Sequence, residues 1–503
     1  MSRTQKFFYN SISTAFYQLI VMIAGFITPR IMLKYYGSEI NGLVSSINQF
    51  IIYFNLVEAG LSGAAIYALY KPLAENNHKA INSIVSAARK FYTQSGYIFI
   101  FLTLGLAAFY PFFVETNMLT PLNVGLLVLI LGTNGALEFL TLAKYRVLLS
   151  ADQKTYVISL ASIVHIITNT IIVIVLGTIQ VNIVLLRFIA LMSIFSRSFI
   201  LMIYVRKKYK YINYKEKPNT EALNKRWDAL YLQITGAVQK GAPVVILTLV
   251  TRDLMLVSVY TIFNMVIASL NGILSIFKSG LSASFGDVIA KGENKVLQKS
   301  YSEFEFSYYA LITVVYSIAF ITIMPFIRIY TSGVTDINYN VPLIGFMFVL
   351  NGLLYNLKTP QGMLVISAGM FRETRVQTTV QGLIAVVLGL ALAPFIGIYG
   401  VLVASILSNI YRDIDLLFFI PRNLTKLPVI ETAKRMFRVG INVVIIWIPF
   451  IYFDINPNGY LEWVINAIIV GIYASLVVVV TSFIFDRVAF KGSYNRVIRM
   501  VKR

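Results

Sequence analysis

Four positively charged side chains lie inside long apolar stretches of the sequence, where a lipid bilayer disfavours them. They are Arg30, Arg187, Lys240 and Lys358. A lysine or arginine at the centre of a membrane helix costs about 2.5–3.5 kcal/mol on insertion scales, so it needs water, a partner or a ligand. Ammonium and guanidinium groups both bind phosphate oxygens. The pattern predicts a cationic path for an anionic substrate, with helix packing or snorkelling to the interface as the alternative.

Two further apolar stretches carry polar residues at helical spacing, so that each set falls on one helix face. The sets are Asn48, Asn55 and Glu58 in the first stretch, and Asn264, Asn271 and Lys278 in the second. The asparagines are expected to line a cavity, with hydrogen bonding between helices as the alternative. Glu58 and Lys278 occupy equivalent positions in the two stretches. They are predicted to form an ion pair that closes the inner mouth of the cavity, with snorkelling of Lys278 to the interface as the alternative.

These residues require membrane helices to position them, and the composition agrees. Of 503 residues, 57% are hydrophobic and 13% are charged, which is too apolar for a soluble protein. The net charge of +21 does not indicate nucleic-acid binding, because the basic residues concentrate in alternate connections between apolar spans. With no cysteine and two histidines, disulfide frameworks, thiol catalysis and Cys/His metal sites are excluded or disfavoured. No catalytic residue, metal or cofactor is predicted.

About fourteen spans are long enough to cross about 30 Å of hydrocarbon. They are predicted at 11–33, 43–70, 93–114, 121–143, 155–177, 180–205, 229–250, 255–279, 304–330, 340–367, 376–395, 397–420, 438–453 and 460–485. The connections after even-numbered spans are rich in lysine and arginine, which places them and both termini in the cytoplasm. These basic connections could also bind anionic lipid, although topology alone explains their charge.

An internal repeat divides the chain into two lobes of parallel orientation. Gly60-Leu61-Ser62 recurs as Gly280-Leu281-Ser282, and a second pair of matching segments, at 149–151 and 366–368, is offset by 217 positions. The sequence predicts a lobe of six helices at 1–205, a basic cytoplasmic linker at 206–228, and a second six-helix lobe at 229–420. A loop, two more helices and a basic tail fill 421–503. A central cavity between such lobes is the expected substrate site.

The N-terminal hundred residues resemble the polysaccharide-flippase (Wzx-like) branch of the multidrug/oligosaccharidyl-lipid/polysaccharide exporter superfamily. The resemblance rests on Pro29-Arg30-Ile31-Met32, Tyr35-Tyr36-Gly37, Asn41-Gly42-Leu43 and Glu58-Ala59-Gly60-Leu61. It implies an all-α, MATE-like membrane fold, and transport of an undecaprenyl-diphosphate-linked oligosaccharide to the outer leaflet of the bacterial cytoplasmic membrane. The expected partners are this lipid-linked glycan, membrane lipids and other membrane proteins of polysaccharide assembly.

Two alternatives stay open at this stage. A cation-coupled multidrug (MATE-type) exporter has the same topology, but its lipophilic cations require acids in the cavity rather than bases. A membrane polysaccharide polymerase commonly needs a large external loop for its chemistry, whereas the outer connections here run about ten residues. The sequence has no Gly-rich phosphate loop of the Walker type. A transporter rather than an enzyme is therefore expected.

Overall fold

The computed structural model describes residues 3–58, 60–220, 226–278, 281–487 and 489–492. Within these ranges the chain is helical and contains no strand. Part of the predicted linker (221–225), Gly280 of the repeat and most of the basic tail (493–503) lie outside the described residues. The chain forms two compact units, Met1–Thr261 and Ile262–Arg503. The predicted lobe boundaries differ from this division and stay a prediction.

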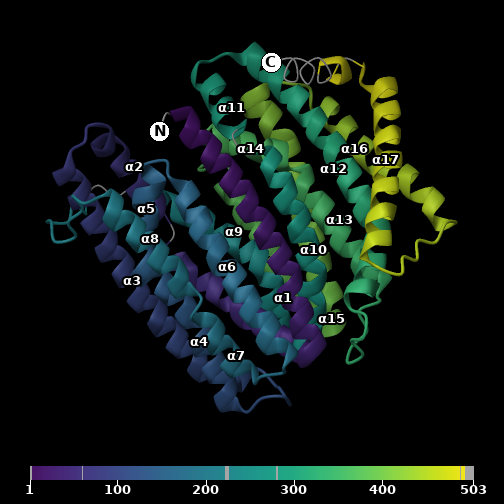
Figure 1. Cartoon of the computed structure of the whole chain (residues 1–503). Helices are drawn as coiled ribbons and strands as arrows, with labels where there is room; N and C mark the ends of the chain where they lie inside the picture. The colour runs from purple at the N-terminus through teal and green to yellow at the C-terminus, as the bar shows by residue number, and fades with distance from the viewer. Residues whose placement is uncertain (1–2, 59, 221–225, 279–280, 488, 493–503) are drawn as a thin grey trace. The chain divides into compact units, whose positions relative to one another are not determined.

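The first unit contains the helices from α1 to η4 (Figure 1). Their bounds are α1 Arg3–Phe54, η1 Asn55–Glu58, α2 Leu61–Ala74, α3 His78–Phe113, α4 Pro121–Leu137, η2 Glu138–Leu142, α5 Ala143–Ala151, α6 Thr155–Thr178, α7 Ile183–Leu191, α8 Ile194–Lys208, α9 Arg226–Ile246 and η4 Leu247–Thr251. One continuous hydrophobic core runs through this unit, and α1 packs along α6 while α3 packs along α4.

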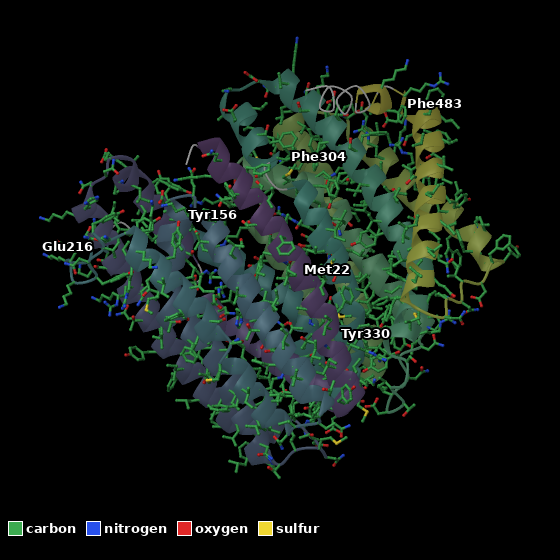
Figure 2. All side chains as sticks on the ribbon, viewed as in Figure 1. Met22, Tyr156, Glu216, Phe304, Tyr330 and Phe483 are labelled. Carbon is green, nitrogen blue, oxygen red and sulfur yellow. The ribbon has the colours of Figure 1, made fainter. Side chains whose placement is uncertain are left out.

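The second unit begins within α10 (Leu254–Lys278). It continues with α11 Leu281–Ala290, α12 Asn294–Tyr330, α13 Pro342–Leu357, α14 Thr359–Ser367, α15 Arg375–Ile420, η5 Pro421–Thr425, α16 Val429–Trp447, η6 Ile448–Ile451 and α17 Tyr460–Phe485. Helices α12 and α17 are antiparallel neighbours: Tyr330 at the end of α12 and Phe483 near the end of α17 lie at opposite ends of the unit (Figure 2).

Ten helices of the described chain are long and apolar enough to cross a membrane. This number of helices is lower than the fourteen or so predicted spans, partly because two of the helices are kinked and each contains two predicted spans. In α1 the kink is at Gly37, whose φ of 80° suits a residue without a Cβ. In α15 it is at Ile396–Gly397. Counting each kinked helix as two spans, and adding α13–α14 and α16, recovers the predicted number. The all-α membrane fold is confirmed.

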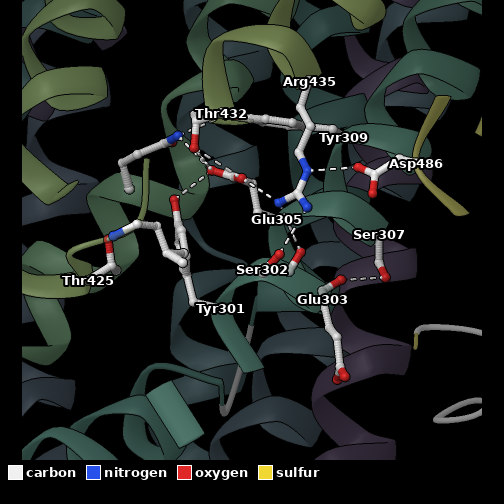
Figure 3. A network of polar contacts seen from close by, with 12 residues as sticks. Tyr301, Ser302, Glu303, Glu305, Ser307, Tyr309, Thr425, Thr432, Arg435 and Asp486 are labelled. Atoms are coloured by element: carbon white, nitrogen blue, oxygen red, sulfur yellow. Dashed lines mark hydrogen bonds and ion pairs between the residues drawn. The ribbon is translucent and has the colours of Figure 1, made fainter. Parts of the chain in front are cut away.

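A buried ion-pair network ties α12 to α16 inside the second unit (Figure 3). Glu305 of α12 is 1% exposed and accepts hydrogen bonds from Arg435 Nη1 at 2.9 Å and from the Tyr301 hydroxyl at 2.8 Å. Arg435 also donates from Nε to Asp486 at 3.0 Å. A buried carboxylate is stable only when paired and hydrogen-bonded, so this network fixes the position of α16 on α12.

Candidate functional site

The first unit contains an acid–arginine cluster where η2, α5 and α8 meet. Glu138 Oε1 accepts hydrogen bonds from Arg146 Nη1 at 2.5 Å and from Arg197 Nη1 at 3.3 Å. Glu138 begins η2, a single π-helical turn between α4 and α5, and such turns are frequent at functional sites. The widened turn and the helix α8 together bring two guanidinium groups, 51 positions apart in the chain, onto one carboxylate.

Glu58 extends this cluster toward the break between α1 and α2. It closes the short 3₁₀ turn η1, and Gly60, with φ of 79°, then starts α2 in a new direction. The Tyr92 hydroxyl donates to Glu58 Oε1 at 3.5 Å, and Glu58 interacts electrostatically with Arg146 and Glu138. Two acids and two arginines therefore lie close together here, and both arginines form their ion pairs with Glu138.

His165 lies beside this cluster on α6. Its Nδ1 is 3.0 Å from the Ser193 hydroxyl, which precedes α8. The ring is half-buried and interacts electrostatically with Arg197 and Glu138. The contact joins α6 to the start of α8, as expected of a residue that packs helices together.

The predicted cations Arg30, Arg187 and Lys240 lie elsewhere in the first unit. Arg30 is half-buried in α1 near Pro29. Arg187 is half-buried in α7 beside Tyr36, and its Nε is buried without a hydrogen-bond partner among the described residues. Lys240 is exposed on α9 and forms no ion pair with any described residue. The acids Glu58 and Glu138 are held by the cluster described above, so they do not neutralise these cations.

Lys358 lies in the second unit, between α13 and α14. Its ammonium donates to Asn409 Oδ1, and Asn409 in turn donates to Asn351 Oδ1 at 2.8 Å. Asp413, one turn beyond Asn409 on α15, is 6% exposed and interacts electrostatically with Lys358. Lys358 therefore has an acid partner inside its own unit, unlike Lys240.

The four predicted asparagines differ in their surroundings. Asn271 Oδ1 accepts from Asn356 Nδ2 at 2.6 Å and from the Tyr316 hydroxyl at 3.0 Å, which joins α10, α13 and α12. Its carbonyl oxygen is thus committed to helix packing. The other three asparagines are exposed on their helices: Asn48, Asn55 and Asn264.

Two of the predictions extend beyond a single unit. Glu58 belongs to the first unit and Lys278, at the end of α10, to the second, so their predicted ion pair stays a prediction. The same holds for the cavity between the lobes.

Among the described residues, no group of three or more His, Cys, Asp or Glu could hold a metal ion.

Several charged residues of these sites were missed by the sequence interpretation. They are Arg197, Asp413, Glu305 and Arg435. The available signal was their position: Arg197 lies in the sixth predicted span, Asp413 in the twelfth, and Glu305 at the start of the ninth. A search for every charge within or at the edge of a span would have found these three.

No protein-family model matches the chain, and no curated protein sequence matches it either. Several solved structures are similar to it. An inward-facing multidrug resistance MATE transporter of the MOP superfamily has a TM-score of 0.66 at 13% identity, over 84% of this chain and 96% of that one. The lipid II flippase MurJ, in an inward closed conformation, has a TM-score of 0.66 at 16% identity, over 95% and 98%. The MATE multidrug transporter DinF-BH has a TM-score of 0.58 at 14% identity, over 85% and 98%.

The apolar helices and these likenesses define the class: this is a multi-pass membrane protein. Its fold is that of the MATE and MurJ transporters of the MOP superfamily.

Proposed function

We propose that the protein is a flippase that moves an undecaprenyl-diphosphate-linked oligosaccharide across the bacterial cytoplasmic membrane. The glycan would supply capsule, teichoic-acid or other surface polysaccharide synthesis. The fold supports a transporter, since its structural neighbours are transporters and include a flippase of a lipid-linked substrate. The N-terminal resemblance described above supports the glycan substrate.

The charge of the first unit is the observation that carries the proposal. Arg187 and Lys240 have no acid partner among the described residues, whereas Glu138 is held by two arginines. Unneutralised cations at membrane depth are stable when a ligand or water compensates them. A diphosphate supplies the compensating charge and accepts several charge-assisted hydrogen bonds. A lipophilic cation would be repelled by the same residues.

The proposed transport follows alternating access. The sugar and diphosphate pass through the protein while the polyprenyl tail stays in lipid. Arg187 and Lys240 replace part of the phosphate hydration, with Arg30 as a third cation along the path. Kinks in α1 and α15 supply points at which the helices bend.

Native mass spectrometry of the purified protein tests the choice of substrate. The probes are an undecaprenyl-diphosphate-linked sugar and a lipophilic cationic dye. We expect the wild type to retain the anionic lipid and Lys240→Ala to retain it about tenfold more weakly, because one charge-assisted contact contributes about 1.5–3 kcal/mol. Lys207→Ala is the matched control, since Lys207 is an exposed lysine at the end of α8.

The outcomes separate the two transporter classes. Retention of the anionic lipid that falls in Lys240→Ala and not in Lys207→Ala supports the proposal. Retention of the dye alone overturns it in favour of a multidrug exporter and makes the membrane cations structural.

A further inference from the structure

The second unit contains a large cavity of about 1330 Å³ between α12, α16 and the end of α17. This volume exceeds the range of about 300–1,000 Å³ that is typical of small-molecule pockets. Its wall carries five basic and three acidic side chains, together with apolar residues of α16 and α17. The cavity therefore combines a net positive wall with an apolar one.

The charged part and the apolar part of the cavity wall follow one another along α16. Lys434, Arg438, Ile441 and Ile445 all line the cavity, and their spacing of four, three and four residues places them on one helix face. At about 1.5 Å per residue, the stripe is about 16 Å long. It is charged near the start of the helix and apolar further into the span. Phe485, 74% exposed, lines the cavity from α17.

The basic residues of the wall are not equally available. Arg435 is 7% exposed and forms ion pairs with Glu305 and Asp486 (Figure 3). Arg438 Nη2 lies 3.4 Å from the same carboxylate of Asp486. Lys295, Lys299 and Lys434 are exposed and make no ion pair or side-chain hydrogen bond with another described residue. Three ammonium groups thus face the cavity without a committed partner.

We propose that this cavity binds an anionic glycerophospholipid of the surrounding membrane. The three free lysines hold the phosphate, and one acyl chain lies along Ile441, Ile445 and Phe485. Basic pockets between membrane helices recognise anionic headgroups in this way. The apolar wall favours a lipid over a soluble phosphate, because burial of acyl methylenes contributes about 0.8 kcal/mol each. The inference is independent of the proposed transport function.

The predicted topology agrees with this occupant. The charged end of the stripe, Lys434 and Arg438, lies within the basic connection 422–438, which the sequence assigns to the cytoplasm. Anionic lipids give the cytoplasmic leaflet its negative surface potential. The lipid would fill the space between α12 and α16 beside the Glu305–Arg435 pair.

Native mass spectrometry of the delipidated full-length protein, titrated with phosphatidylglycerol, tests the site. We expect the variant K295Q/K299Q/K434Q to bind phosphatidylglycerol at least about tenfold more weakly, since each lysine near an anionic headgroup contributes about 1 kcal/mol. The matched control is K207Q/K208Q/K210Q, which removes the same charge from exposed lysines of the first unit. Its binding should change less than about twofold. Zwitterionic phosphatidylethanolamine should be unaffected in both.

A second variant tests the apolar wall. I441S/I445S should weaken phosphatidylglycerol binding and leave the binding of glycerol phosphate unchanged. Equal losses in the two triple variants would overturn the proposal in favour of general surface attraction. Glycerol phosphate that binds as well as phosphatidylglycerol would reduce the site to an anion site. Displacement of phosphatidylglycerol by equimolar undecaprenyl diphosphate would assign the cavity to the transported substrate.

Discussion

Asn41 donates a hydrogen bond from Nδ2 to the Ser258 hydroxyl at 2.8 Å, and both residues are buried. They are 217 positions apart, which is the offset of the repeat segments at 149–151 and 366–368. In these two helices the pairs Asn48/Asn264 and Asn55/Asn271 are 216 positions apart, so Asn41 and Ser258 are one position out of register with them. Beside them the Ser46 and Thr248 hydroxyls are 2.7 Å apart. These contacts join α1 to η4 and α10.

Gly42 makes this close approach possible. A Cβ on Gly42 would clash with the backbone carbonyl of Leu254 and lie 3.2 Å from the Ser258 amide nitrogen. Backbone cannot move aside as a flexible side chain does, so we expect Gly42→Ala to lower stability by about 1–3 kcal/mol or more. The measurement is thermal unfolding in detergent. Gly25→Ala is the control in the same helix, because nothing lies within 4 Å of its Cβ position. Equal effects of the two changes would contradict this packing.

The Glu305–Arg435 pair predicts an asymmetric mutational response. Arg435→Met leaves a 1%-exposed carboxylate without its guanidinium, and removal of one partner of a buried pair costs about 3–5 kcal/mol. Glu305→Gln with Arg435→Met removes both charges, so the double variant should be more stable than Arg435→Met alone. Thermal unfolding of the single and double variants measures the difference. A double variant less stable than Arg435→Met would show that the charges do not act as a pair.

Asp152, in the connection after α5, predicts a pH dependence of stability. Burial raises its pKa, but hydrogen bonds from Lys154, Tyr209 and Lys6 outweigh burial and hold the pKa below its ordinary value of 3.8. A carboxyl with a depressed folded-state pKa stabilises the fold above its unfolded pKa and loses that contribution as pH falls through the folded value. Asp152→Asn should therefore be less stable than the wild type at pH 7.

The difference between Asp152→Asn and the wild type should shrink below about pH 4. Unfolding temperatures of the two proteins between pH 7 and pH 3 test this. Asp287→Asn is the control, because Asp287 is an exposed acid whose ion pair, among the residues that the structure describes, is with exposed Lys291. A gap for Asp152→Asn that is constant with pH would contradict the assignment.

Under the proposed function, Glu138 would compete with the anionic substrate for Arg146 and Arg197, which it holds in ion pairs. Glu138→Gln removes that competition, and each released guanidinium can bind two phosphate oxygens. We expect the variant to retain an undecaprenyl-diphosphate-linked sugar several-fold more strongly than the wild type in native mass spectrometry. Weaker retention would assign the cluster to helix packing alone. The exposed acid Glu75, paired with Lys71, supplies the control Glu75→Gln.

The spans were predictable because hydropathy and length are local properties of the sequence. The last predicted span, 460–485, has the bounds of α17, and the span 255–279 differs from α10 by one residue at each end. The break at η1 inside the predicted span 43–70 was missed. Gly60 was noticed as part of a repeat, but not as the residue of positive φ, 79°, that precedes α2.

The pairing of charges could not be predicted, because it depends on which helices become neighbours. Glu305 and Arg435 are 130 positions apart, and Glu138 and Arg197 are 59 apart. Nothing in the sequence around any of these four residues specifies its partner. The prediction of a cationic path needed only the positions of lysines and arginines within the apolar spans. Which cations stay unpaired, such as Lys240, required the helix packing.

Translocation of a fluorescent undecaprenyl-diphosphate-linked sugar in proteoliposomes tests the central claim most directly. A membrane-impermeant quencher reports the fraction of label in the outer leaflet. The account predicts that the wild type exchanges the labelled lipid between leaflets, that Lys240→Gln exchanges it more slowly, and that Lys207→Gln behaves as the wild type. A wild type that leaves the labelled lipid in place while it moves a lipophilic cationic dye would contradict the account.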